Sequence, residues 1–159
     1  MSEPVTELLG RRGYALPELR PKAGKYSGYV EVGNLLFLSG QGADGHRGRV
    51  GADMTLDEGR SAAHDCMLNL LAQVDDALDG AWERFVRPVK VLGFVACTED
   101  FHDTPKVIDG ASEMLIEVFG DAGQHARSAI GAQSLPLGFA VEIEMVVEIV
   151  PRGRAGADG

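Results

Sequence analysis

The sequence predicts an α+β fold in which a single mixed β-sheet of about six strands carries two helices on one face. Apolar runs of strand and helix period follow one another in the order strand, strand, helix, strand, helix, strand, strand. The 159 residues suit one hydrophobic core. We assign the domain to residues 26–150, with an N-terminal arm over 1–25 and a tail over 151–159.

The arm and the tail have different compositions. Val5, Leu8 and Leu9 have the spacing of a short helix, which Gly13 would end before prolines impose an extended connection. The tail is rich in glycine and charge, which is typical of disordered segments. Neither segment therefore contributes a strand to the predicted sheet.

A hairpin signal opens the domain. Two β-prone runs, 29–32 and 35–39, are separated by Gly33 and Asn34, which both tolerate positive φ. The glycine-rich stretch 40–51 then predicts a loop, with a further short strand near Arg49 and Val50. That strand would be the sixth of the sheet.

The first long helix is predicted from Thr55 onward, because Thr55 and Glu58 have the spacing of a capping box. Gly80 is placed to end this helix. Its apolar residues recur every three or four positions and predict one buried stripe: Ala63, Cys66, Met67, Leu70, Leu71, Val74 and Leu78.

A mostly apolar run over 86–99 predicts an interior strand, and a second helix follows. We expect Thr104 to cap that helix, Pro105 to lie in its first turn and Gly120 to follow its end. The two remaining strands are predicted over 126–132 and 139–150.

The last strand predicts which face of the sheet is buried. Its residues alternate, so Val141, Ile143, Met145, Val147 and Ile149 would share the core face, and the opposite face would carry Glu142 and Glu144. That opposite face also has too many apolar groups to stay in water, which favours its burial against partner subunits.

Composition limits the function. A net charge of −9 disfavours binding to nucleic acid or anionic lipid, so neither partner is expected. No run is long and apolar enough to span a membrane, and a cytoplasmic location is the default expectation. Cys66 and Cys97 are expected to be reduced core thiols. The histidines lack metal-ligand spacing, so no metal site is predicted.

Three stretches carry a family resemblance: VGNLLFLSGQ at 32–41, VKVLGFV at 89–95 and ARSAIGAQSLPLGFAVEIE at 126–144. They resemble, in order and spacing, the RidA (YjgF, L-PSP endoribonuclease-like) family of enamine and imine deaminases, in a branch with a longer arm. The resemblance implies a chorismate mutase-like fold, a homotrimer with three clefts between subunits, and a reaction without a cofactor. In that reaction water adds to the C=N bond of a small 2-imino acid, giving a 2-keto acid and ammonia.

The resemblance assigns the two main site residues. Arg127 would bind the substrate carboxylate with its planar fork of donors, and Glu142 would hold and activate water. We expect these side chains, from neighbouring strands, to converge on one cleft between subunits. The alternatives are an exposed strand arginine paired with an acid and a carboxylate that is solvated or bridges subunits.

Four further positions match the family's cleft. Tyr26 would line it or donate a hydrogen bond, unless it only covers a core edge, and Ser39 would form a polar wall or satisfy a turn. Ala129 stands where relatives often have cysteine, which leaves main-chain contacts to the substrate carboxylate. Asp109 stands where many relatives have asparagine and bears on substrate choice, because an ionised carboxylate cannot donate.

The leading interpretation is therefore a hydrolase of the 2-iminobutanoate/2-iminopropanoate deaminase type. A trimer that binds small carboxylates without turnover, or has a regulatory role, is the alternative. An endoribonuclease is disfavoured, since the sequence has no stripe of basic residues with stacking aromatics.

Overall fold

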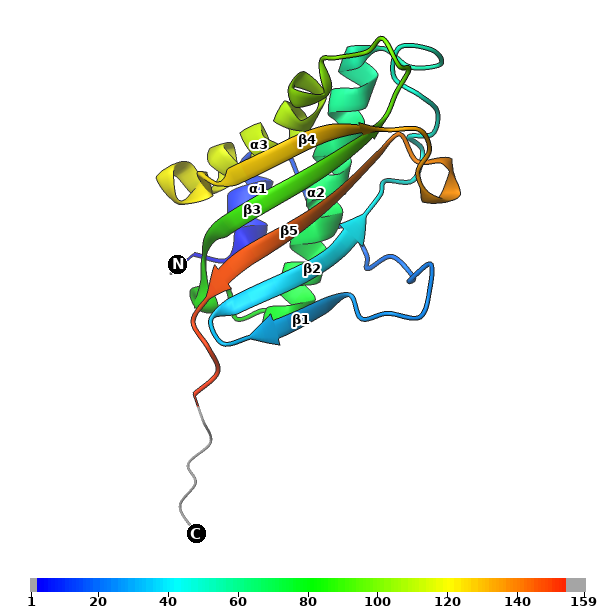
Figure 1. The fold of residues 1–159 in the computed structure, drawn as a ribbon. Helices are drawn as coiled ribbons and strands as arrows, with labels where there is room; N and C mark the ends of the chain where they lie inside the picture. Colours follow the sequence, from blue (N-terminus) through cyan, green and yellow to red (C-terminus); the bar gives the residue numbers. More distant parts are fainter. Residues whose placement is uncertain (1–2, 154–159) are drawn as a thin grey trace.

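The computed structural model describes residues 3–153 and contains one five-stranded sheet with its helices on one face (Figure 1). The strand order is β1-β2-β5-β3-β4. The helices are α1 (Val5–Gly10), α2 (Leu56–Leu78) and α3 (Thr104–Phe119), the strands are β1 (Tyr29–Val32), β2 (Leu35–Gln41), β3 (Phe85–Ala96), β4 (Ala126–Ala132) and β5 (Val141–Ile149), and short 3₁₀ turns lie at η1 (Trp82–Arg84), η2 (Gly120–Gly123) and η3 (Pro136–Gly138).

The sheet is mixed, as predicted. β1 and β2 form the predicted antiparallel hairpin, with Gly33 at a φ of +61° in the turn. β5 pairs antiparallel with both β2 and β3, whereas β3 and β4 are parallel and are connected through α3. A parallel pair needs such a crossover because its two strands run in the same direction.

The expected sixth strand near Arg49 and Val50 does not form. Val50 makes only isolated bridges, to Met54 and Cys97. Gly48 and Gly51 flank this segment at φ values of +125° and +93°, which lie outside the extended conformation of a strand. The sheet therefore has five strands, where about six were expected.

Both long helices form where they were predicted, but only one has the predicted cap. The Thr55 side chain accepts from the Glu58 amide and the Glu58 carboxylate accepts from the Thr55 amide, which confirms the capping box. Thr104 is not the cap of α3. It is the first helical residue, after Asp103, and its hydroxyl donates to the Ala129 carbonyl at 3.1 Å.

The core lies between the sheet and the helices. The five alternate residues of β5 predicted to face inward are all buried, and so is the predicted apolar stripe of α2. Val5 and Leu9 of α1 are also fully buried in this core. The arm is thus packed against the domain through its helix.

The other face of the sheet is uncovered and partly apolar in the single chain. Val30 and Phe37 are paired across β1 and β2 and are 54% and 45% exposed. Ile130 of β4 is 48% exposed. Exposed apolar side chains on this face are what the sequence led us to expect, and their burial against partner subunits stays a prediction.

Two expectations concern the chain ends and membranes. Residues 151–153 have no regular secondary structure, and the rest of the tail predicted to be disordered lies outside the described residues. Among residues 3–153, no helix is long and apolar enough to cross a membrane.

Candidate active site

The predicted site residues fall into two groups on opposite faces of the sheet. Tyr26, Ser39 and Glu142 line one cavity of about 490 Å³, which we call the acidic cavity. Arg127 and Asp109 form an ion pair on the helix-covered face, and Ala129 lies next to them along β4.

The acidic cavity is built from several separate parts of the chain. β5 contributes Glu142 and Glu144, and an irregular part of β2 contributes Ser39 and Gly40. The remaining walls come from Gln73 of α2, from the end of the arm and from the segment around η3, and the last two lie at the same end of the sheet in Figure 1. The cavity therefore exists only in the folded chain, because its parts are far apart in sequence.

A register shift in β2 makes room for Glu142. The regular pairing of β2 with β5 is interrupted between Leu38 and Gln41. At Gly40 in this interruption, an added Cβ would lie 2.5 Å from Glu142 Oε1. The carboxylate thus occupies the space that a side chain at position 40 would fill.

The environment of Glu142 changes its acidity. Burial raises the pKa of the Glu142 carboxyl above its ordinary value, and the nearby negative charge of Glu144 raises the pKa further. A carboxylate with a raised pKa is a better proton acceptor at neutral pH than an ordinary glutamate. The environment of Glu142 therefore makes it a stronger base than an ordinary glutamate.

Two predicted side chains in the cavity have defined hydrogen bonds. The Ser39 hydroxyl donates to the Ser27 carbonyl at 2.6 Å and so links β2 to the segment that precedes β1. The Tyr26 phenol oxygen accepts from the Ala23 amide at 3.3 Å. Both bonds tie the end of the arm to the cavity wall.

The arm also contributes cations that sequence reasoning missed. Arg20 and Lys22 line the acidic cavity. Arg20 is fixed by two hydrogen bonds to Asp44, at 3.1 and 3.0 Å, and its guanidinium lies 4.8 Å from the centre of the Phe139 ring. The segment that holds Arg20 and Lys22 is irregular and has no periodicity, so no local signal indicated that these residues line the same cavity as Glu142.

Arg127 projects from β4 toward the helices. It pairs in register with the fully buried Val91 of β3, and Nη1 donates to Asp109 Oδ1 at 2.7 Å and to Ser112 Oγ at 3.2 Å. Its side chain is 22% exposed, so the guanidinium can still reach a ligand. Arg127 was expected either to bind a ligand or to pair with an acid, and the pair with an acid is observed. That pair engages only Nη1 of the guanidinium.

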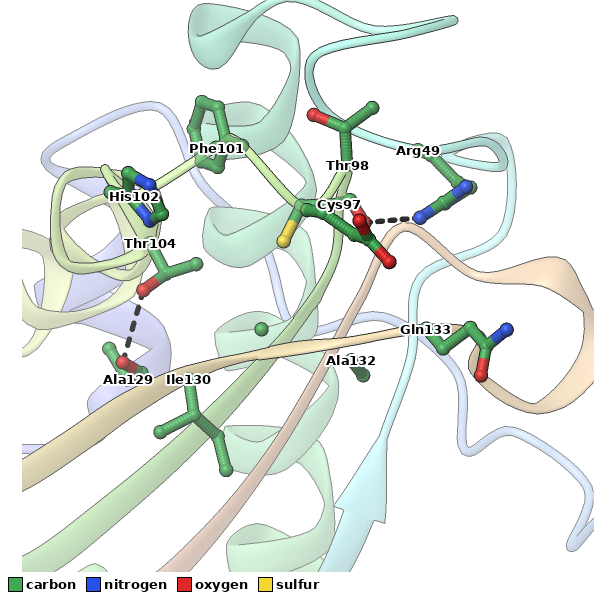
Figure 2. Close-up of a pocket in the computed structure, with 12 residues that line it drawn as sticks. Arg49, Cys97, Thr98, Phe101, His102, Thr104, Ala129, Ile130, Ala132 and Gln133 are labelled. Carbon is green, nitrogen blue, oxygen red and sulfur yellow. Dashed lines mark hydrogen bonds between the residues drawn. The ribbon is translucent and has the colours of Figure 1, made fainter.

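Beyond Arg127, a pocket of about 860 Å³ follows the outer edge of β4, shown in Figure 2. Ala129 and Gln133 line one side of this edge pocket, and Phe101 and His102 line another. Two carbonyls in its wall are already bonded, because Arg49 Nη2 donates to Cys97 O at 2.5 Å and Thr104 donates to Ala129 O.

Within one chain, Arg127 and Glu142 do not converge, contrary to the expectation for side chains on neighbouring strands. β3 separates β4 from β5, and the two residues face opposite sides of the sheet. The reason is that β3, which comes earlier in the chain, inserts between the last two strands. A single chain therefore holds two separate halves of the predicted site.

The described residues offer no cluster of three or more histidine, cysteine, aspartate or glutamate side chains suited to a metal ion. Cys66 is fully buried, and burial raises the pKa of its thiol far above the ordinary value. The ionisable side chains that line the acidic cavity are the carboxylates Glu142 and Glu144, the phenol of Tyr26 and the cations Arg20 and Lys22.

Replacing Gly40 by alanine is expected to displace the Glu142 carboxylate. The added methyl would contact Oε1, Cδ and Cγ of Glu142 at 2.5–3.1 Å, so the glutamate must rotate away. Any reaction that needs this carboxylate should lose about tenfold or more in kcat, while the fold is retained. Steady-state kinetics would measure kcat, and circular dichroism would check the fold. Gly10→Ala is the control, because an added Cβ there meets no neighbouring atom; Gly45→Ala would be strained by its positive φ.

The chain is similar to known proteins over most of its length. Residues 7–149 match a family model described as "YjgF/chorismate mutase-like, putative endoribonuclease". A Trypanosoma cruzi protein named TCP17 is 38% identical over 151 residues, covering 91% of this chain and 94% of that protein. A Dermatophagoides farinae protein named 2-iminobutanoate/2-iminopropanoate deaminase is 33% identical over 126 residues, covering 79% and 87% of the two chains.

Two solved structures are similar over nearly the whole chain. A protein of unknown function from Agrobacterium tumefaciens has a TM-score of 0.86 and 37% identity, with 92% of each chain covered. A "putative endoribonuclease" from Shewanella oneidensis also has a TM-score of 0.86, with 31% identity, covering 92% of this chain and 99% of that one. The range matched by the family model, residues 7–149, includes the residues that line the acidic cavity and the whole of β4.

Proposed function

This chain belongs to the YjgF/chorismate mutase-like family, and from that membership we propose that it hydrolyses small 2-imino acids to 2-keto acids and ammonia. The observation that carries the proposal is the half-buried Glu142 carboxylate, whose raised pKa and position in a cavity suit a base that activates water. The name of the Dermatophagoides farinae relative supports the same chemistry.

In the proposed reaction, Glu142 accepts a proton from water as the water oxygen adds to the C=N carbon. Glu142 passes that proton to the imine nitrogen, and a carbinolamine forms. Transfer of the carbinolamine hydroxyl proton to the nitrogen, again through Glu142, breaks the C–N bond and gives the keto acid and ammonia. The C=N bond is already electrophilic, so positioning and a suitably placed acceptor supply the catalysis without a cofactor.

We propose that Arg127 binds the substrate carboxylate from a neighbouring subunit. Arg127 and Glu142 lie on opposite faces of one chain, so both can act on one small substrate only if two chains form the cleft. The exposed apolar side chains Val30, Phe37 and Ile130 on the uncovered face support burial against another copy. The closed homotrimer implied by the resemblance would give three such clefts.

The decisive assay generates imines in place. An amino-acid oxidase or a serine/threonine dehydratase would supply 2-imino acids, and the release of ammonia and keto acid would be timed with and without this protein. Faster release supports the proposal. Binding of 2-oxobutanoate without faster release would instead favour a carboxylate-binding trimer without turnover.

The Asp109–Arg127 pair is the feature that favours weak carboxylate binding, since Asp109 neutralises the charge that a ligand would use. Asp109→Asn should therefore tighten the binding of 2-oxobutanoate by about threefold, a modest gain because both side chains are partly exposed. Calorimetry would measure the dissociation constant. Asp103→Asn is the matched control, because Asp103 pairs with Lys106 on the same helix; unchanged or weaker binding in Asp109→Asn would contradict this account.

A further inference from the structure

A chain of hydrogen bonds holds the Arg127 guanidinium from behind. Arg127 Nη1 donates to Ser112 Oγ at 3.2 Å, Ser112 Oγ is 2.9 Å from His125 Nε2, and His125 Nδ1 is 2.7 Å from the Gly123 carbonyl oxygen. We propose that Ser112 and His125 are positioning residues that fix which edge of the Arg127 guanidinium meets the substrate carboxylate. This inference rests on the proposed function.

With a neutral imidazole, the partners determine the direction of every hydrogen bond in the chain. A carbonyl oxygen can only accept, so His125 Nδ1 carries a proton and donates to Gly123. In the neutral imidazole Nε2 is then an acceptor, and the Ser112 hydroxyl donates to it. The Ser112 oxygen keeps its lone pairs for Arg127 Nη1. One tautomer of His125 thus satisfies the whole chain.

This arrangement uses both hydrogens of Nη1 and leaves the other edge of the guanidinium open. One Nη1 hydrogen goes to Asp109 and the other to Ser112. Among residues 3–153, no acceptor is bonded to Nε or Nη2 of Arg127. The Nε–Nη2 edge is one of the two-donor edges that bind a carboxylate bidentately. Ser112 and Asp109 together therefore select the edge that a ligand can use.

The positions of the two residues suit this role. Ser112 lies on the inner side of α3 and is only 9% exposed, so its hydroxyl cannot turn to solvent. His125 follows η2 and immediately precedes β4. The imidazole therefore links η2, which follows α3, to β4, the strand that carries Arg127. It also limits the rotation of the Ser112 hydroxyl.

The test separates positioning from simple packing through a split between KM and kcat. Ser112→Ala should raise KM for the imine and the dissociation constant of 2-oxobutanoate about fivefold, with kcat unchanged, because a ground-state contact is loosened equally in the transition state. Ser112→Thr retains the hydroxyl and should restore wild-type KM. Ser128→Ala is the matched control, since that neighbouring serine bonds Lys90 instead of Arg127.

His125→Phe tests the same role independently of Ser112→Thr, whose added methyl group has to fit into the packing around α3. It keeps an aromatic ring but removes the acceptor for Ser112, so KM should rise with unchanged kcat. A ¹⁵N spectrum of wild-type His125 should show the Nδ1-protonated tautomer. The opposite tautomer, or wild-type KM in both Ser112→Ala and His125→Phe, would overturn the positioning role while leaving the proposed function intact. A wild type that neither binds 2-oxobutanoate nor speeds ammonia release would overturn the proposed function and this inference together.

Discussion

Glu142→Gln is expected to lower kcat for imine hydrolysis by about 10²- to 10⁴-fold, the usual contribution of a positioned general base. Glutamine retains the volume and one carbonyl oxygen of the side chain but cannot accept a proton from water. Glu142 lies half-buried beside Gly40, and the other carboxylate that lines the cavity, Glu144, is left unchanged in this variant. Single-turnover measurements with an imine generated in place would isolate this step from substrate binding.

A matched control and a pH profile sharpen this test. Glu148→Gln changes the same residue type on the same face of β5, where Glu148 bonds Arg87 outside the acidic cavity, and should leave kcat within about twofold. In the wild type, the rate should fall as the pH drops through the raised pKa of Glu142, because the protonated carboxyl is no longer a base. A Glu142→Gln variant with the wild-type rate would exclude Glu142 as the base.

Arg127→Ala is expected to lower kcat/KM by about 10- to 100-fold, mainly through KM, which is the usual cost of losing charge-assisted hydrogen bonds to a carboxylate. Arg127→Lys should recover only part of this loss, because an ammonium keeps the charge without the planar fork. Removing Arg127 leaves Asp109 unpaired, but that side chain is 40% exposed and can be solvated, so the melting temperature should change little. Arg60→Ala, which loses an ion pair with Glu113 on the helix surface, is the matched control.

Mixing the two impaired variants tests whether two subunits share one site. If Arg127 and Glu142 act from different chains, co-refolded Arg127→Ala and Glu142→Gln subunits should regain activity in roughly a quarter of the clefts, those that receive both native residues by chance. If both residues act from the same chain, mixing would restore nothing. Equal rates for wild type and Arg127→Ala would remove Arg127 from the mechanism altogether.

The success of the sequence predictions depended on how local each signal was. The capping box at Thr55 and the alternation along β5 use contacts between residues two to four positions apart, and both are confirmed. The cap expected at Thr104 was wrong because that hydroxyl is used by a distant partner, the Ala129 carbonyl of β4. Arg49 and Val50 were wrongly predicted as a strand because β-propensity at two positions does not outweigh the flanking glycines.

For the candidate site, the sequence supplied residue types but not their neighbours. Motif positions identified Glu142 and Arg127, and the raised pKa of Glu142 fits a base, but spacing could not predict that Asp109 would pair with Arg127. Arg20 and Lys22 were missed because an irregular segment has no period from which to infer what it faces. The roles assigned to these residues remain predictions for the assays above.

The sequence by itself determined the types and order of the helices and strands, the buried face of the last strand and the family resemblance, because these depend on short-range periodicity and on motifs. Tertiary structure alone decided that β3 lies between β5 and β4, and hence that Arg127 and Glu142 face opposite sides of the sheet. Strand order is set by pairing between segments tens of residues apart, whose free energy comes from burying the whole sheet against α2 and α3, and no local spacing records it.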